Sequence, residues 1–146
     1  MIFLRSFGII FLLGAFGYGL IETVWRGYSH WTMMIAGGIS FTVFALISRC
    51  GIPLLYKCIF GSFTVTAIEL CFGSIFNLGL GLHVWDYSSL PFNLFGQVCL
   101  LYSVLWGWLS LVAVPFAGAA LNRLSGTTKI AEGNYYELSA QGLGGN

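Results

Sequence analysis

The stretch CIFGSFTVTAIELCFGSIFNLGLGL, residues 58–82, decides the fold class of this chain. It is apolar over a length that crosses the hydrocarbon core of a bilayer as a helix, which takes about 20 residues. Glu69 lies near its middle, where a carboxylate costs about 2.5–3.5 kcal/mol on insertion scales. A cost of that size predicts that Glu69 has a partner or a function.

The polar and small residues of this stretch recur at steps of three and four residues, so they share one face of a helix. They are Ser62, Thr66, Glu69, Gly73 and Asn77. One interpretation is a packing seam whose polar groups satisfy one another, and another is a polar axis that binds a ligand. For Glu69 we favour the second, because a neutral Gln would pack as well at a lower insertion cost.

Composition places the whole chain in a lipid bilayer. Of its 146 residues, 58% are hydrophobic and 8% are charged, against about 25% charged residues in soluble domains. Six cations nearly balance five anions, which argues against nucleic acid as a partner. The sequence has neither the GxxxxGK(S/T) loop of ATPases nor the GxSxG motif of hydrolases. We therefore expect no catalytic residue, no cofactor and no metal.

Four segments are long and apolar enough to span a bilayer as helices, namely residues 2–25, 31–48, 58–82 and 94–121. The predicted fold is all-α, with these helices arranged as two hairpins. Each hairpin carries one membrane carboxylate, one histidine and a tryptophan-bearing loop, as in a parallel repeat. Residues 1–121 then form the transmembrane domain, and residues 122–146, which lack apolar periodicity, form a flexible tail.

The distribution of Lys and Arg predicts the orientation. Four spans put both termini on the same side as the middle loop, and this side carries five cations, Arg5, Arg49, Lys57, Arg123 and Lys129. The opposite side carries Arg26 alone. Because positive loops stay inside, we expect a multi-pass protein of the plasma membrane with both termini and the tail in the cytosol.

Stripes of small residues also follow the first and fourth predicted helices. The first stripe is Gly8, Ala15, Gly19, Glu22 and Arg26, and the fourth helix offers Gly96, Cys99, Ser103, Gly107 and Ser110. Small residues let helices approach closely, and Glu22 can pair with Arg26 one turn away. We expect these faces to meet around an axis lined by Glu22, Glu69 and Asn77. The same faces favour a homodimer in the bilayer, alone or within a larger membrane complex.

Polar residues also gather where the predicted helices end on the side opposite the termini. They are Glu22, Arg26, His30, His83, Asp86, Asn93 and Gln97. Folded together, they could bind a small polar or charged ligand. Histidines and carboxylates are also metal ligands, but His30 and His83 lie too far apart for a compact metal motif. Alternatively, both histidines form interfacial hydrogen bonds beside Trp31 and Trp85, and Asp86 caps a turn.

Three stretches in the second half of the chain resemble a family signature. They are WDYSSLPFN (residues 85–93), GQVCL (96–100) and SVLWG (103–107). They are similar to the motif of the bacterial membrane family labelled "Putative ABC-transporter type IV", or CmpB-like. YGLIE (18–22), WRGYSHW (25–31) and AIEL (67–70) resemble other parts of the same family, so that the resemblance covers about residues 15–110.

The resemblance implies a permease-like, transport-related role without a defined substrate. Carried over position by position, it points to Glu22, Arg26, His30, Glu69, Trp85, Asp86, Asn93 and Gln97. We therefore expect a membrane protein that binds a small polar solute or a cation along a polar axis centred on Glu69, with protonation of Glu69 as its switch. The alternatives are an accessory module of a larger membrane complex and an intramembrane enzyme that uses outer His, Asp and Glu residues.

Overall fold

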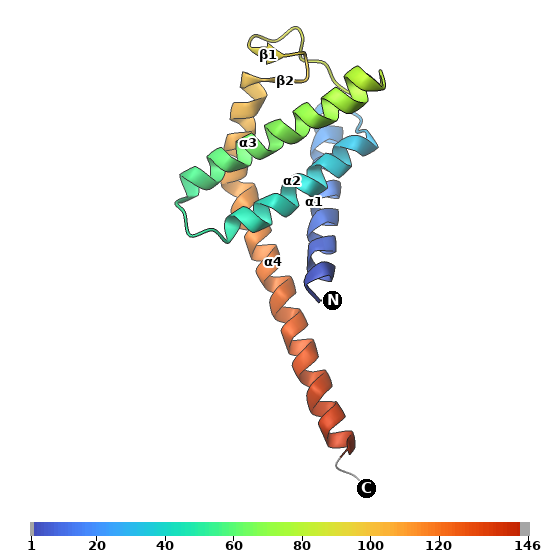
Figure 1. The fold of residues 1–146 in the computed structure, drawn as a ribbon, viewed down its shortest axis with the longest axis vertical. Helices are drawn as coiled ribbons and strands as arrows, with labels where there is room; N and C mark the ends of the chain where they lie inside the picture. Colours follow the sequence, from blue (N-terminus) through green and yellow to red (C-terminus); the bar gives the residue numbers. More distant parts are fainter. Residues whose placement is uncertain (1, 144–146) are drawn as a thin grey trace.

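The computed structural model describes residues 2–143, and it describes side chains for residues 4–126. Within that range the chain is mostly helical (Figure 1). Its elements are α1 (Ile2–Arg26), α2 (Trp31–Ser48), α3 (Leu54–Phe72), the π-helix η1 (Gly73–Gly79), β1 (Asn93–Leu94), β2 (Val98–Cys99) and α4 (Leu100–Leu143). Four segments of this range are long and apolar enough to cross a membrane: Leu4–Arg26, Trp31–Ser48, Leu54–Gly79 and Leu100–Gly126.

The starts of two predicted spans are wrong. The third span begins at Leu54 rather than at residue 58, directly after Pro53, which is its N-cap. The missing N–H of proline costs nothing at the start of a helix. The fourth begins at Leu100 rather than at residue 94, because β1 and β2 form a short antiparallel pair there. Phe92 and Phe95 both have positive φ, a conformation that a helix does not allow.

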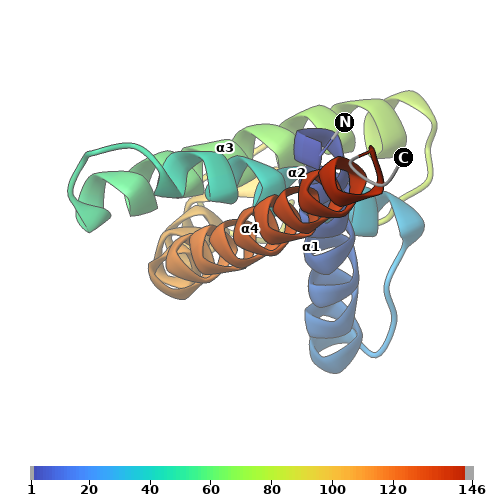
Figure 2. The same ribbon diagram turned by 90° about the horizontal axis from the view of Figure 1, so that it is seen from below.

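The helices cross rather than form a parallel bundle. α1 and α4 run along the length of the molecule, and α2 and α3 lie side by side across them in both views (Figures 1 and 2). α2 packs against α1, α3 and α4. The β1–β2 loop lies at the end of the molecule where α4 begins (Figure 1). The grouping of the helices as two repeated hairpins and the cytosolic location of the termini stay predictions.

The main core draws on every helix that crosses the molecule. It is formed by buried residues of α1, α2, α3 and α4, namely Ile10, Phe44, Ala45, Val65, Val114, Ala117 and Leu121. α1 and α2 pack closely at several glycines, of which two show the contact. A Cβ on Gly37 would collide with the side chain of Tyr18, and one on Gly14 would collide with Phe41.

The polar stripe of the third span faces the fourth. Ser62 Oγ donates a hydrogen bond to the carbonyl oxygen of Ser103 at 2.5 Å, and Thr66 Oγ1 donates to Ser103 Oγ at 3.0 Å. A Cβ on Gly61 would meet Ser110 Oγ. The hydroxyl groups of this stripe therefore connect α3 to α4 by hydrogen bonds. Glu69 is the one ionisable residue of the stripe.

α4 continues as a helix to Leu143, through the stretch in which the sequence predicts a flexible tail. Residues 144–146 of the predicted tail lie outside the described residues. The division at residue 121 and the flexibility of the tail stay predictions.

The close approach of α1 and α2 can be tested at Gly37. The substitution Gly37→Ala places a methyl group against Tyr18, and overpacking of this kind costs about 1–3 kcal/mol. We expect a lower melting temperature in detergent, measured by the loss of helical circular dichroism. Gly8→Ala is the matched control, because a Cβ at Gly8 meets nothing within 4 Å. An equal melting temperature for the two variants would contradict the proposed crossing contact.

Candidate functional site

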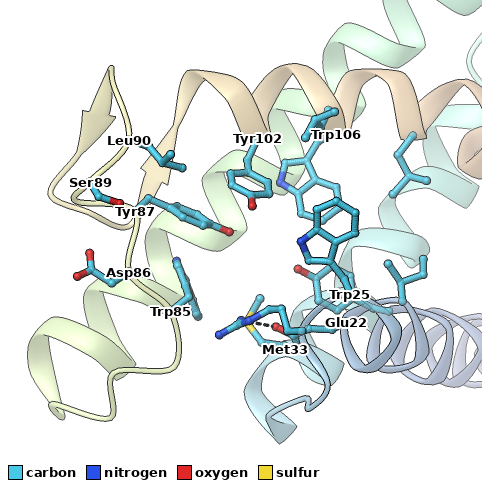
Figure 3. Close-up of a pocket in the computed structure, with 15 residues that line it drawn as sticks. Glu22, Trp25, Met33, Trp85, Asp86, Tyr87, Ser89, Leu90, Tyr102 and Trp106 are labelled. Atoms are coloured by element: carbon cyan, nitrogen blue, oxygen red, sulfur yellow. Dashed lines mark hydrogen bonds and ion pairs between the residues drawn. The ribbon is translucent and has the colours of Figure 1, made fainter.

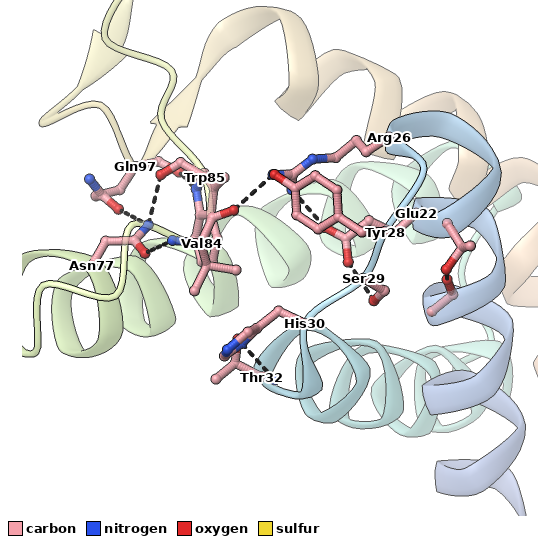
Figure 4. A network of polar contacts seen from close by, with 12 residues as sticks. Glu22, Arg26, Tyr28, Ser29, His30, Thr32, Asn77, Val84, Trp85 and Gln97 are labelled. Carbon is pink, nitrogen blue, oxygen red and sulfur yellow. Dashed lines mark hydrogen bonds and ion pairs between the residues drawn. The ribbon is translucent and has the colours of Figure 1, made fainter.

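The side chain of Asn77, on η1, ties the loop between η1 and α4 to the helices. Asn77 is buried, and its Oδ1 accepts a hydrogen bond from the backbone N–H of Val84 at 2.7 Å. Its Nδ2 donates to the carbonyl oxygen of Trp85 at 2.9 Å and to Gln97 Oε1 at 2.8 Å (Figure 4). One amide thus satisfies three groups from two sides of the loop, which suits its buried position.

Trp85 and Gln97 complete this network. Trp85 Nε1 donates to the carbonyl oxygen of Gln97 at 2.8 Å, and Gln97 Nε2 donates to that of Phe95 at 2.9 Å. Trp85 and Gln97 are both buried. The sequence analysis selected Asn77, Trp85 and Gln97 as ligand-binding residues. In the structure, their side chains form hydrogen bonds with groups of the loop.

Glu22 and Arg26 form the predicted ion pair at the end of α1. Arg26 Nη1 donates to Glu22 Oε1 at 2.8 Å, and the hydroxyl group of Ser29 donates to Glu22 Oε2 at 2.7 Å. Arg26 Nη2 also donates to the carbonyl oxygen of Val84 at 2.8 Å and to the hydroxyl group of Tyr28 at 2.9 Å (Figure 4). The guanidinium group therefore joins α1 to the loop that Asn77 holds.

A cavity of about 610 Å³ lies between α1 and α4, below this loop. Figure 3 shows the rings of Trp25, Tyr87, Tyr102 and Trp106 around a common space, with the Glu22 carboxylate at one side. Tyr18 and Trp85 also line it. Tyr87 stacks on Tyr102 with ring centroids 4.6 Å apart. Burial raises the pKa of the Tyr87 phenol well above its usual value, so this ring stays neutral.

Glu69 lies behind the Trp106 wall of the cavity. Its side chain is 2% exposed, and Trp106 Nε1 donates to Glu69 Oε2 at 3.0 Å. Glu69 Oε1 is buried and has no hydrogen-bond partner among the described residues. A buried polar atom without a partner is rare and costly. Tyr18, whose ring centroid lies 5.7 Å from that of Trp106, belongs to the same wall.

The remaining predicted site residues occupy turns. His30 caps α2, where its Nδ1 accepts from the backbone N–H of Thr32 at 3.4 Å, and its ring lies beside Trp31. Asn93 Nδ2 donates to the carbonyl oxygen of Leu90 at 2.8 Å within the loop. His83 is exposed and has a positive φ. No group of three or more His, Cys, Asp or Glu side chains that could hold a metal occurs in the described part of the chain.

Asp86 closes a turn at the outer edge of the cavity. Its Oδ1 accepts from the backbone N–H of Ser88 at 2.8 Å, and its Oδ2 accepts from the Ser88 hydroxyl group at 2.9 Å. These bonds hold the pKa of the Asp86 carboxyl group below its usual value. The Asp86 carboxylate points away from the aromatic rings (Figure 3).

The structure therefore divides the predicted site residues into three groups. Asn77, Trp85 and Gln97 hold the loop. Glu22 and Arg26 line the cavity, and Glu69 lies behind its Trp106 wall. The turn residues are His30, His83, Asp86 and Asn93. The sequence analysis missed the cavity walls formed by Tyr18, Trp25, Tyr87, Tyr102 and Trp106. The one signal for these walls was the 17% content of aromatic residues, which does not show which of them meet in the fold.

Comparison with known proteins identifies one family. Residues 7–137 match the family model described as "Putative ABC-transporter type IV". No curated protein and no solved structure matches the chain. The family match gives no substrate, so a more specific assignment rests on the geometry of the cavity.

The loop network can be tested at Asn77. Asn77→Leu fills the same space but leaves the N–H of Val84 and two buried acceptors without partners, at about 1–3 kcal/mol for each unsatisfied group. We expect faster hydrogen exchange for the backbone amides of residues 83–99. Ser74→Ala is the control on η1, because Ser74 is exposed. Unchanged exchange in the Asn77 variant would show that the network does not hold the loop.

The Asp86 turn makes a prediction about pH. Because the folded pKa lies below the usual value of 3.8, the ionised carboxylate stabilises the turn above that pH. The stabilisation is lost as the pH falls through the folded pKa. We expect the NMR shift of the Asp86 carboxyl carbon to titrate with a midpoint below 3.8, and Ser88→Ala to raise this midpoint. A midpoint that Ser88→Ala leaves in place would refute the Ser88 hydroxyl contribution.

Proposed function

Because the chain belongs to the "Putative ABC-transporter type IV" family, we propose that it is a transport-related membrane protein that binds a small cation. The binding site is the cavity between α1 and α4, and Glu69 is the buried counter-charge. The observation that carries this proposal is the unpartnered Glu69 Oε1 atom. A buried carboxylate is costly unless it is paired, and the single Trp106 N–H that it accepts is a neutral donor.

The charges around the cavity favour a cation over an anion. Among the described residues, Arg26 is the one cationic side chain that lines the cavity, and its guanidinium group is committed to Glu22, Tyr28 and the Val84 carbonyl oxygen. The carboxylate of Glu22 lies at the wall of the cavity, and that of Glu69 lies behind it. An anionic solute would meet repulsion from these groups and would find no uncommitted guanidinium group.

The aromatic walls support the same choice of ligand. The faces of Trp and Tyr rings attract cations through the ring quadrupole, with energies of about 0.5–1 kcal/mol at exposed sites and about 2 kcal/mol or more when desolvated. Six such rings line the cavity, those of Tyr18, Trp25, Trp85, Tyr87, Tyr102 and Trp106. Aromatic rings grouped in this way recognise quaternary ammonium groups, which carry a positive charge but no N–H donor.

Trp106 separates the cavity from Glu69. Its indole lines the cavity and donates to the carboxylate, so a rotation of this side chain exposes Glu69 to a bound cation. Proton binding by Glu69 removes the counter-charge and releases the cation, which provides a switch between bound and free states. An ATP-driven cycle requires a partner subunit, because this sequence has no GxxxxGK(S/T) loop. We also propose that the protein acts in the plasma membrane as a homodimer.

The two alternatives make different predictions. An accessory module of a larger complex would bind no cation by itself. An intramembrane enzyme would need its outer His and carboxylate groups to converge, and in the described part of the chain His30 and Asp86 are each engaged in turns of their own. The cavity and Glu69 therefore favour the cation-binding protein.

The role of Glu69 is tested by the substitution Glu69→Gln. Gln keeps an oxygen that can accept from Trp106 but removes the negative charge, so we expect the fold to persist. We expect binding of tetramethylammonium to fall by about tenfold or more, the loss of about 1.4 kcal/mol or more of ion pairing. The measurement is isothermal titration calorimetry of the protein in lipid nanodiscs.

Asp86→Asn is the matched control for this experiment. Asp86 is an exposed carboxylate at the edge of the cavity that points away from the rings, so we expect its loss to change binding little. Equal affinity of wild type and Glu69→Gln for tetramethylammonium would overturn the assignment of Glu69 as counter-charge.

A further inference from the structure

A second, smaller cavity lies next to the first, in the contact region between α1 and α4, which we call the seam. It has a volume of about 240 Å³ and lies among residues of α1, α2, α3 and α4. Four residues line both cavities, Tyr18, Ile21, Trp106 and Leu109. The two cavities are therefore neighbours separated by these side chains, and we call the first the upper cavity and the second the lower cavity.

The two cavities differ in chemistry. The upper cavity carries Glu22, Arg26 and the aromatic rings. The lower cavity is lined by apolar side chains and glycines, with Tyr18 and Ser40 as its polar members. The Ser40 hydroxyl group already donates to the carbonyl oxygen of Ala36 at 2.8 Å, so it offers little to a polar ligand. A cavity of this kind stays dry and accepts apolar groups.

The seam is also open on the side that a bilayer would cover. Trp25 and Leu105, at the upper cavity, are 76% and 46% exposed, and Val112, at the lower cavity, is 70% exposed. All three belong to candidate membrane spans. An alkyl chain can therefore pass from the lipid into the lower cavity without crossing a polar environment.

We propose that the site takes an amphiphile, an organic cation that carries an alkyl chain. Its ammonium head occupies the upper cavity, and its chain occupies the lower one. This proposal rests on the proposed function and adds the substrate class. A dry apolar chamber contributes nothing to the binding of a small hydrophilic cation, but it holds the chain of an amphiphile whose head is fixed above it.

The orientation of the two chambers fits such a ligand. The upper cavity lies below the loop of residues 85–90, at the end of the membrane-spanning helices, and the lower one lies deeper along α1 and α4. An amphiphile in a bilayer is ordered in the same way, with its head at the interface and its chain in the hydrocarbon core. The ligand keeps its orientation when it moves from the lipid into the seam.

The experiment compares two ammonium ions that share a head and differ in their chain. Binding of tetramethylammonium and of octyltrimethylammonium is measured by calorimetry in nanodiscs, with empty nanodiscs subtracted to remove partitioning into lipid. The lower cavity is then filled by Gly17→Leu, because Gly17 lines it and a Cβ there meets nothing within 4 Å. Ala113→Leu fills the same cavity from α4. Gly8→Leu is the matched control, since Gly8 lines neither cavity and has free space.

We expect both filling variants to weaken octyltrimethylammonium by about tenfold or more, as overpacking of an occupied site does. Tetramethylammonium should change by less than about twofold, and Gly8→Leu should bind both ions as wild type does. If the filling variants change the affinity for the two ions equally, or change neither affinity, the proposal that the ligand is an amphiphile is wrong. Failure of wild type to bind tetramethylammonium would instead contradict the proposed function, so the two failures are distinguishable.

The source of the amphiphile is settled by native mass spectrometry without added ligand. A lipid with an ammonium headgroup that is retained by wild type and Gly8→Leu, and lost from Gly17→Leu and Ala113→Leu, identifies a membrane lipid as the ligand. Retention of an anionic lipid in all four proteins would contradict a cationic head in the upper cavity.

Discussion

The structure depends on the burial of one amide, that of Asn77, between a membrane-spanning helix and a loop. Backbone groups that lie at the edge of the hydrocarbon core must be satisfied inside the protein. Asn77 satisfies groups of Val84, Trp85 and Gln97 at once, and Arg26 satisfies the carbonyl oxygen of Val84. The loop is thereby fixed over the gap between α1 and α4. Without these hydrogen bonds, the aromatic side chains of the loop would not be held facing those of α4.

The two carboxylates of the membrane spans, Glu22 and Glu69, differ in how many hydrogen bonds they accept. Glu22 accepts hydrogen bonds on both oxygens, from Arg26 and Ser29, so its charge is balanced within the protein. Glu69 accepts one hydrogen bond, from Trp106, and its second oxygen has no partner among the described residues. Under the proposed function, this difference distinguishes the structural carboxylate Glu22 from the binding carboxylate Glu69. A ligand or a proton would then complete the environment of Glu69 and offset its insertion cost.

The family signature acquires a physical meaning in the folded loop. Asp86 and Asn93 shape its turns, and Trp85 and Gln97 lock it. The signature residues therefore shape the loop that covers the cavity. Tyr102 and Trp106, which α4 presents below this loop, line the cavity itself. Because this loop covers one end of the contact between α1 and α4, the cavity beneath it has polar and aromatic walls, and the neighbouring cavity farther along the helices is apolar.

The sequence by itself determined the membrane class, the four spans and the Glu22–Arg26 pair. These follow from composition and from helical spacing, which are local properties. The tertiary structure alone decided the β1–β2 pair, the loop network and the cavity. Loop geometry requires positive φ at residues such as Phe92, which residue type does not signal. The aromatic walls come from α1, the loop and α4, and residues so far apart in the chain meet only once the helices have packed.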